Sequence, residues 1–244
     1  MTGLPAVLLF FTAMLFFRFL FRDHVKQELR EIPSLRFLIQ AMDDSVEKGK
    51  RIFLALGHGG LIGIPAASGF ISLSLLPSVI KRSIQGDKPP AVVSGESALD
   101  ILAESAAQLG IRDMEDIDLA GSAEVSLTGL TPFAYAAGTL PIVSQESTAM
   151  SVLLGSFGSE IGLIVDEAVN CGGAVVAGSE NLVAQAVLTA AVPDVLVGED
   201  LFAAGAYCQS GKMHIASLQA QDFFRVVLIV VLFLGIAAKI IGVL

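Results

Sequence analysis

The sequence predicts an α/β fold: a mainly parallel β-sheet flanked by helices, with one N-terminal and one C-terminal transmembrane helix. Three observations lead to this prediction. Short apolar segments alternate with helical segments through the middle of the chain, which is typical of a parallel sheet covered on both faces. Both ends of the chain are long apolar runs. The mean hydropathy of +0.73, with only 16% charged residues, is too high for a water-soluble protein of 244 residues.

The two apolar ends are predicted to be membrane spans. Residues 4–21 and 223–244 are each long enough to cross a hydrocarbon core of about 30 Å as a helix. A secretory signal peptide is the alternative for the first run, but no basic residue precedes it, and Arg18 stands where a small-residue cleavage site would be needed. The residues expected at the membrane interface are Arg18, Arg22, Arg225 and Lys239.

These spans divide the chain into regions and set its predicted topology. The regions are a transmembrane helix at 4–21, an amphipathic connector at 22–51, an α/β domain at 52–222 and a second transmembrane helix at 223–244. Basic residues gather at the domain end of both spans, so the positive-inside rule places the domain in the cytoplasm. Both termini are then expected on the outer side of the membrane.

Hydrophobic periodicity gives the expected elements of the central domain. In the connector, apolar residues recur at helical spacing at Leu35, Leu38, Ile39, Met42 and Val46. Strands are expected at 52–56, 91–94, 125–127, 140–144, 174–177 and 195–197. Helices are expected at 97–109, closed by Gly110, and at 132–137, 147–169, 181–191 and 201–207.

One stretch tests this topology. Residues 52–80 contain no Asp, Glu, Lys or Arg, so a third span or a re-entrant loop has to be considered. The stretch also holds five glycines and two prolines, which would expose unsatisfied backbone to lipid. We therefore expect a buried strand, a glycine-rich loop, and a helix that packs against the sheet, the membrane face or another subunit.

Three predicted strands lead into a glycine and an acidic residue just before a helix. These turns are Ser94-Gly95-Glu96, Gly178-Ser179-Glu180 and Gly198-Glu199-Asp200. The carboxyl ends of parallel strands meet at one edge of the sheet, where such folds bind ligands. The acids either build a cation or amine site or simply cap helices, and the sequence leaves both readings open. Because carboxylates occupy the helix starts that a phosphate would use, nucleotide binding is disfavoured. The candidate ligand-binding residues are Gly57, His58, Ser94, Glu96, Glu180, Glu199 and Asp200.

Other motifs do not meet the requirements of known sites. The Gly57–Gly63 loop resembles a dinucleotide-binding loop, but its third glycine falls one residue late, and Lys81 and Arg82 stand where a ribose-binding acid would be expected. A Ser-His hydrolase is not indicated, because the chain has three histidines and no G-x-S-x-G motif. Cys171 and Cys208 show no spacing suited to zinc. We therefore expect no catalytic set, no metal site and no cofactor.

Charge is distributed unevenly and bears on the expected partners. The chain carries a net charge of −9, and residues 89–211 contain a single basic residue, Arg112. Nucleic acid is therefore not an expected partner, since phosphate binding needs clustered Lys and Arg. With two cysteines, the chain is not a disulfide scaffold. The basic residues of 18–88 are expected to lie near anionic lipids, with the acidic part facing away.

Three segments together resemble a known family. They are residues 133–138 (FAYAAG), residues 197–207 (VGEDLFAAGAY) and residues 216–222 (ASLQAQD), which lead into the last apolar run. In this order they resemble an uncharacterised family of bacterial and archaeal membrane-anchored proteins with a domain of unknown function. The resemblance covers most of residues 25–244. It implies a cytoplasmic α/β domain anchored in a prokaryotic cell membrane, and it implies no activity.

Two functions of different kinds follow as expectations. The first is a membrane-anchored scaffold that assembles into homo-oligomers, because the charge-free runs 52–80 and 125–145 offer more apolar surface than one domain is expected to bury. The second is a membrane-tethered sensory domain that binds a small ligand or cation at the acidic strand ends. An enzyme is the least favoured class, because no base and nucleophile can be assembled from the sequence. The lipid bilayer and further copies of the chain are the expected partners.

Overall fold

The computed structural model describes residues 31–60, 62–83, 88–112, 123–145, 148–208 and 212–241, and the isolated positions 7, 11, 12 and 15. The chain forms two compact units. One comprises residues 29–210 and contains the whole β-sheet. The other comprises residues 1–28 and 211–244, and its long helix is α9 (Lys212–Ile241).

The larger unit is built on a six-stranded, all-parallel sheet. Its strands are β1 (Arg51–Gly57), β2 (Ala91–Ser94), β3 (Glu124–Leu127), β4 (Thr148–Ser156), β5 (Ala174–Gly178) and β6 (Val195–Leu196). They lie in the order β3-β2-β1-β4-β5-β6, and every pair of neighbours is parallel. This is the order of doubly wound sheets, in which the chain builds outward from the centre twice, in opposite directions. The α/β part of the sequence prediction is thus confirmed.

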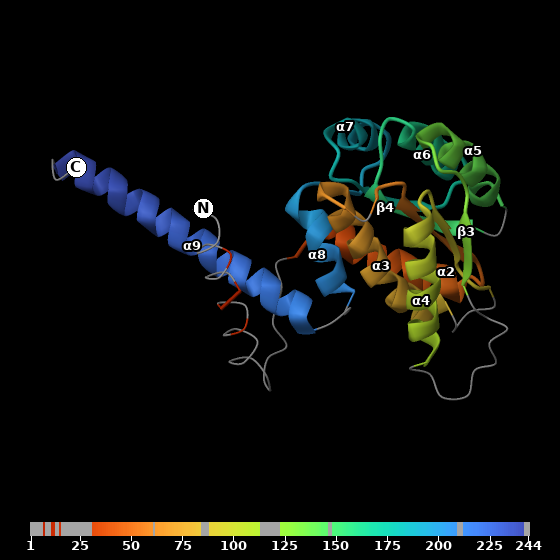
Figure 1. Cartoon of the computed structure of the whole chain (residues 1–244), viewed down its shortest axis with the longest axis horizontal. Coiled ribbons are helices and arrows are strands. Elements are labelled where there is room, and N and C mark those ends of the chain that lie inside the picture. The colour runs from red at the N-terminus through yellow and green to blue at the C-terminus, as the bar shows by residue number, and fades with distance from the viewer. Residues whose placement is uncertain are drawn as a thin grey trace. The chain divides into compact units, whose positions relative to one another are not determined.

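Helices cover both faces of the sheet. They are α2 (Pro33–Glu47), α3 (Ile64–Ser83), α4 (Ser97–Arg112), α5 (Pro132–Val143), α6 (Ile161–Asn170), α7 (Leu182–Ala191) and α8 (Glu199–Tyr207). Figure 1 shows α5, α6 and α7 along one face, and α2, α3, α4 and α8 along the other. The change of face occurs between β3 and β4, where α5 carries the chain back to the centre of the sheet.

The two central strands form the core of the fold. Nearly every residue of β1 and β4 is buried, as expected for strands that are covered on both faces. Beneath α5, α6 and α7, a continuous apolar cluster includes Phe53 of β1, Leu153 of β4 and Val175 of β5. On the opposite face of the sheet, α3 packs on both β1 and β4.

The charge-free stretch 52–80 is accommodated inside this unit. It forms β1, the following loop and most of α3, as the sequence predicted. Apolar side chains of α3 such as Leu75, Leu76 and Ile80 are fully buried. The buried hydroxyl of Ser72 bonds to the carbonyl of Leu154 in β4. These contacts bury most of the run within one chain, so this part of the apolar surface does not call for a partner.

Two predicted elements between residues 138 and 169 are wrong. Residues 140–143 continue helix α5 instead of forming a strand, and residues 148–156 form strand β4 instead of the start of a long helix. Only 161–170 of the predicted helix 147–169 is the helix α6. A smaller difference is that α4 runs through Gly110 to Arg112, where the glycine allows Pro77 of α3 to approach closely.

The predicted membrane spans are not shown. Within the described parts of the chain, no helix combines the length and the apolar character needed to cross a membrane. The predicted span 4–21, together with Arg18 and Arg22, lies almost wholly outside the described residues. The predicted span 223–244 falls on α9, and its last three residues are likewise outside them. On α9, Arg225 pairs with Asp222 at 3.7 Å, and Lys239 is exposed.

Candidate functional site

The candidate site lies at the carboxyl edge of the sheet, between β1 and β4. These neighbouring strands lead to helices on opposite faces, because β1 continues into α3 and β4 continues into α6. The two connections therefore diverge from this point, which is where ligands bind in doubly wound sheets. The loops after β1, β2, β4 and β5 all reach this region.

Backbone contacts hold the loop after β1 against its neighbours. Gly57 has a φ of 83°, in the left-handed region, and a Cβ there would clash with the carbonyl of Ser156. The next amide, of His58, donates to that same Ser156 carbonyl at 3.0 Å. On the other side, the amide of Gly95 donates to the carbonyl of Gly57 at 2.9 Å. The loop is thus fixed between the ends of β2 and β4, with His58 projecting from it.

His58 is paired with a buried carboxylate. Its Nε2 lies 2.7 Å from Oε1 of Glu160, whose side chain is only 2% exposed, whereas the His58 side chain is 21% exposed. The same Oε1 also accepts from the amide of Gly158 at 2.6 Å. Glu160 occupies the N-cap position of α6, but its side chain makes no capping hydrogen bond there. When Glu160 is ionised, Nε2 carries the proton, which leaves Nδ1 of His58 free for a further hydrogen bond.

A second carboxylate lies one strand away. Ser156, at the end of β4, donates to Oε1 of Glu180 at 2.6 Å. The other carboxylate oxygen, Oε2, is buried and has no hydrogen-bond partner. Ser179 fixes this region by accepting from the amide of Phe157 at 3.2 Å, across the ends of β4 and β5. Glu180, a partly exposed residue, therefore presents a buried acceptor atom that has no hydrogen-bond partner.

Tyr135 of α5 borders the site and packs against His58. The side chain is fully buried, and its ring lies edge-on to His58 with 6.2 Å between centroids. Burial raises the pKa of its hydroxyl well above the ordinary value, and the charge of Glu160 adds to this effect. The hydroxyl lies near the backbone of Gly57 and the side chain of Thr139 but meets hydrogen-bond geometry with neither. The site thus contains two buried polar atoms without partners, one on Tyr135 and one on Glu180.

The other residues singled out in the sequence have separate roles. Glu96 accepts from the amide of Leu99 at 3.1 Å, so this acid caps α4, as one of the two readings predicted. Ser94 donates to Asp100 of the same helix at 2.9 Å. Glu199 and Asp200 form the first turn of α8, after β6, which is two strands away from β4.

For Glu180 the capping reading is wrong. The N-cap of α7 is Asn181, whose side chain accepts from the amide of Val183 at 2.9 Å. The carboxylate of Glu180 points instead to Ser156. Of the predicted ligand-binding residues, the structure therefore gathers Gly57, His58 and Glu180 around Ser156 at the end of β4.

Three members of the site were missed in the sequence, namely Tyr135, Ser156 and Glu160. Two of them follow or end β4, the strand that was taken for part of a helix. A signal was present, because Gly158-Ser159-Glu160 repeats Gly178-Ser179-Glu180. A ribose-binding acid, expected in the sequence at Lys81 and Arg82, would also stand at a different position in this fold. The end of β2 is reached at Ser94, not near Lys81, because α3 extends over 20 residues.

Within the described parts of the chain, no three His, Cys, Asp or Glu side chains are placed to hold a metal ion together. The site contains two pairs, the carboxylate of Glu180 with Ser156 and the carboxylate of Glu160 with the imidazole of His58. These groups favour a ligand that donates hydrogen bonds or carries a positive charge.

Comparison with known proteins gives a family and no further relative. Neither a curated protein nor a solved structure matches the chain. The resemblance seen in the sequence is confirmed, and one of its motifs, residues 133–138, places Tyr135 in the site. A family model matches residues 2–244, so the chain belongs to the family described as Domain of unknown function (DUF6754).

Proposed function

We propose that the protein is a membrane-tethered domain that binds a small cationic ligand, such as an amine, at the carboxyl edge of its sheet. The observation that carries this proposal is the buried, unpartnered Oε2 of Glu180 beside the His58–Glu160 pair. A buried acceptor without a partner is unfavourable by about 1–3 kcal/mol, and a ligand N–H would restore the missing hydrogen bond.

The electrostatics favour an amine over a nucleotide. In doubly wound sheets a phosphate is held by the free amides at the start of a helix. Here Glu96 caps α4, and Glu160, although its side chain turns to His58 instead of capping, places a carboxylate at the N-cap position of α6. A phosphate would be repelled by these charges, whereas an ammonium group would be attracted by Glu180.

Membrane tethering is supported by the two apolar ends of the chain. Residues 226–233 of α9 are eight consecutive apolar residues, and each is at least 38% exposed. An exposed helix that is apolar on all sides needs lipid or protein around it. Together with residues 4–21, this segment is proposed to anchor the protein in a prokaryotic membrane, with the domain in the cytoplasm and both termini outside.

The test is ligand-dependent stabilisation of the full chain in mild detergent. Thermal unfolding is measured with ethanolamine, with spermidine and, as an anionic comparison, with AMP. A bound amine at one hundred times its Kd stabilises by about 2.7 kcal/mol, which for a domain of this size raises Tm by roughly 5–11 °C. AMP is not expected to act at this site.

Variants assign the effect to the site. Glu180→Gln keeps the shape of the side chain but removes its charge, and it should abolish the amine-dependent shift. Glu96→Gln is the matched control, because it removes a carboxylate from the same edge of the sheet at a residue that caps α4. An absence of stabilisation by the amines, or an amine shift that survives in Glu180→Gln, would overturn the proposal.

A second candidate is the homo-oligomeric scaffold, which one observation favours. Leu127, Leu130 and Phe133 are 41%, 68% and 64% exposed, and they lie together in sequence at the edge strand β3 and the start of α5. An exposed edge strand with apolar side chains is a typical self-association site. Native mass in mild detergent tests it: Phe133→Glu should dissociate the assembly, and a monomeric wild-type protein would exclude this function.

A further inference from the structure

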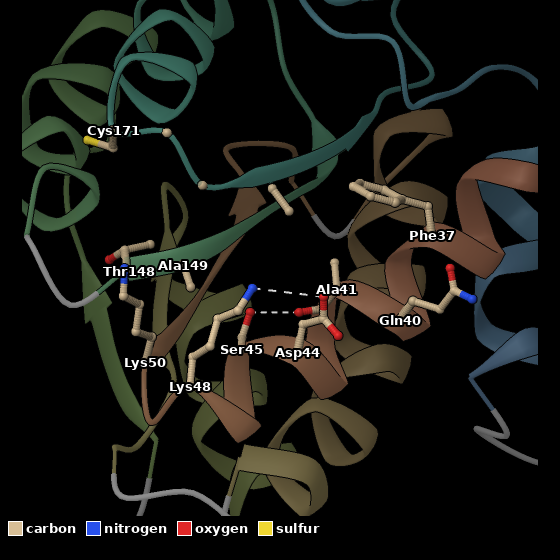
Figure 2. A pocket seen from close by; sticks show the side chains of 13 residues that line it. Phe37, Gln40, Ala41, Asp44, Ser45, Lys48, Lys50, Thr148, Ala149 and Cys171 are labelled. Carbon is tan, nitrogen blue, oxygen red and sulfur yellow. Dashed lines mark hydrogen bonds and ion pairs between the residues drawn. The ribbon is translucent and has the colours of Figure 1, made fainter.

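A cavity lies at the opposite, amino-terminal edge of the sheet. It has a volume of about 260 Å³ and is bounded by α2, the starts of β4 and β5, and the turn after α6 (Figure 2). The side chains that define its chemistry are Asp44, Ser45, Lys48, Lys50, Thr148 and Cys171. The residues proposed to bind an amine lie at the other edge, so this cavity is a separate feature.

One buried polar group among the residues that line this cavity has no partner. Thr148 begins β4 and is only 6% exposed, and its Oγ1 is buried without a hydrogen bond. Ser45, by contrast, is satisfied, because its hydroxyl donates to the carbonyl of Ala41 at 2.6 Å. A buried hydroxyl that lines a cavity and bonds to nothing is a donor available to a ligand.

Two lysines provide positive charge beside this hydroxyl. Lys48 is already engaged, because it pairs with Asp44 one turn earlier in α2, at 3.9 Å. Lys50 is exposed and has no carboxylate partner in the described part of the chain. Figure 2 shows its side chain extending toward Thr148 from the turn before β1. The cavity therefore joins a free ammonium group to a free hydroxyl donor.

We propose that this cavity binds the oxyanion of a small soluble ligand, a phosphate or a carboxylate. One oxygen of the anion accepts from Oγ1 of Thr148, and the charge is neutralised by Nζ of Lys50. A cationic ligand is disfavoured by both lysines, and a neutral apolar one would leave the hydroxyl unpaired. Partial desolvation and the charge of the nearby Glu167 raise the pKa of the exposed Cys171 thiol, so this group adds no negative charge to the cavity.

The experiment is isothermal titration of the full chain in mild detergent with inorganic phosphate and, separately, with acetate. Binding of either anion is expected in the wild-type protein, and the preferred one identifies the group that the cavity takes. Thr148→Val, which has nearly the same shape, should weaken binding about fivefold through the lost hydrogen bond. Lys50→Met should weaken it roughly tenfold or more, because a charge-assisted contact is lost.

Controls separate this site from general charge effects. Lys81→Met removes the same charge from α3, outside the cavity, and should leave the affinity unchanged. Thr148→Ser keeps the hydroxyl and should bind as the wild type does, which covers the case in which the valine variant fails to fold. The proposal is overturned if neither anion binds, if Lys81→Met weakens binding as much as Lys50→Met, or if Thr148→Val binds with full affinity.

Discussion

Replacing Gly95 by alanine tests how tightly the carboxyl edge of the sheet is packed around His58. A Cβ built on Gly95 would lie 2.5 Å from Cβ of His58 and 3.0 Å from Cδ2 of Tyr135. Neither neighbour has room to retreat. The amide of His58 is held by the carbonyl of Ser156 at 3.0 Å, and the ring of Tyr135 is fully buried. The added methyl group must therefore displace the loop after β1, the tyrosine ring, or Gly95 itself.

The magnitude follows from this lack of room. Adding a methylene-sized group to a well-packed core costs about 1–3 kcal/mol in free energy of unfolding. The upper part of this range applies, because moving Gly95 also stretches its 2.9 Å hydrogen bond to the carbonyl of Gly57. We expect a loss of about 2–3 kcal/mol. For a domain of this size that corresponds to a decrease in Tm of roughly 4–12 °C.

The assay is urea unfolding followed by circular dichroism, since the chain has no tryptophan to report by fluorescence. Gly60→Ala is the matched control: it makes the same change in the loop after β1, but a Cβ there meets nothing within 4 Å. The control should stay within about 0.5 kcal/mol of the wild type. If Gly95→Ala is as stable as Gly60→Ala, the edge is not packed as described, and the placement of His58 against Gly95 is refuted.

Three further predictions concern other groups. A double-mutant cycle with His58→Ala and Glu160→Gln should give a coupling of about 1–3 kcal/mol in urea unfolding, because the pair is nearly buried; a coupling near zero would show that the two side chains do not interact. Without ligand, Thr148→Val should unfold with the same or a higher free energy than the wild type, since it removes an unpartnered buried hydroxyl; a loss above about 1 kcal/mol would reveal a partner in the protein. Cys208 should react with iodoacetamide far more slowly than the exposed Cys171 at pH 8, read by mass spectrometry, and equal rates would contradict its burial. Burial raises the pKa of the Cys208 thiol to about 11 from its ordinary value of 9.0, which lowers the fraction of reactive thiolate about a hundredfold at this pH.

The sequence predicted those elements whose pattern has one interpretation. Residues 52–56, 91–94 and 174–177 are short β-rich runs bounded by glycine or polar residues, and each is a strand in the structure. The helix at 181–191 was marked by Asn181, which is its N-cap. In these segments the local residue preferences and the tertiary structure favour the same secondary structure.

Strand β4 could not be recognised in this way. It is covered on both faces, so its residues are apolar on both sides and show no alternation. A run of this kind, which contains Gly155 and is followed by Gly158, has the composition of a small-residue helix as much as of a buried strand. The same holds in reverse for residues 140–143, which are apolar and β-branched in part but continue α5 through Pro141. Only the pairing of β4 with β1 and β5 distinguishes the alternatives.

Missing β4 had a direct effect on the prediction of the site. His58 and Glu180 were identified because each follows a strand that the sequence revealed. Glu160 follows β4, and Tyr135 lies on α5. Their contacts with His58 depend on the connection from β3 to β4 through α5, which sequence periodicity cannot predict. Local patterns gave the ends of the strands, whereas the strand order decided which ends meet.

The same helix geometry underlies both proposed binding sites. In a doubly wound sheet the connecting helices run antiparallel to the strands, so their positive N-termini gather at the carboxyl edge and their negative C-termini at the amino edge. In this chain, carboxylates such as Glu96 and Glu160 stand at the N-termini, and Lys48 stands at the C-cap of α2. The side chains thus reverse the charge that the backbone gives each edge. An amine is then drawn to the carboxyl edge and an oxyanion to Lys50 at the amino edge. Phosphate binding that is kept in Lys50→Met and strengthened in Glu180→Gln would show that the backbone dipoles, and not these side chains, decide where an anion binds.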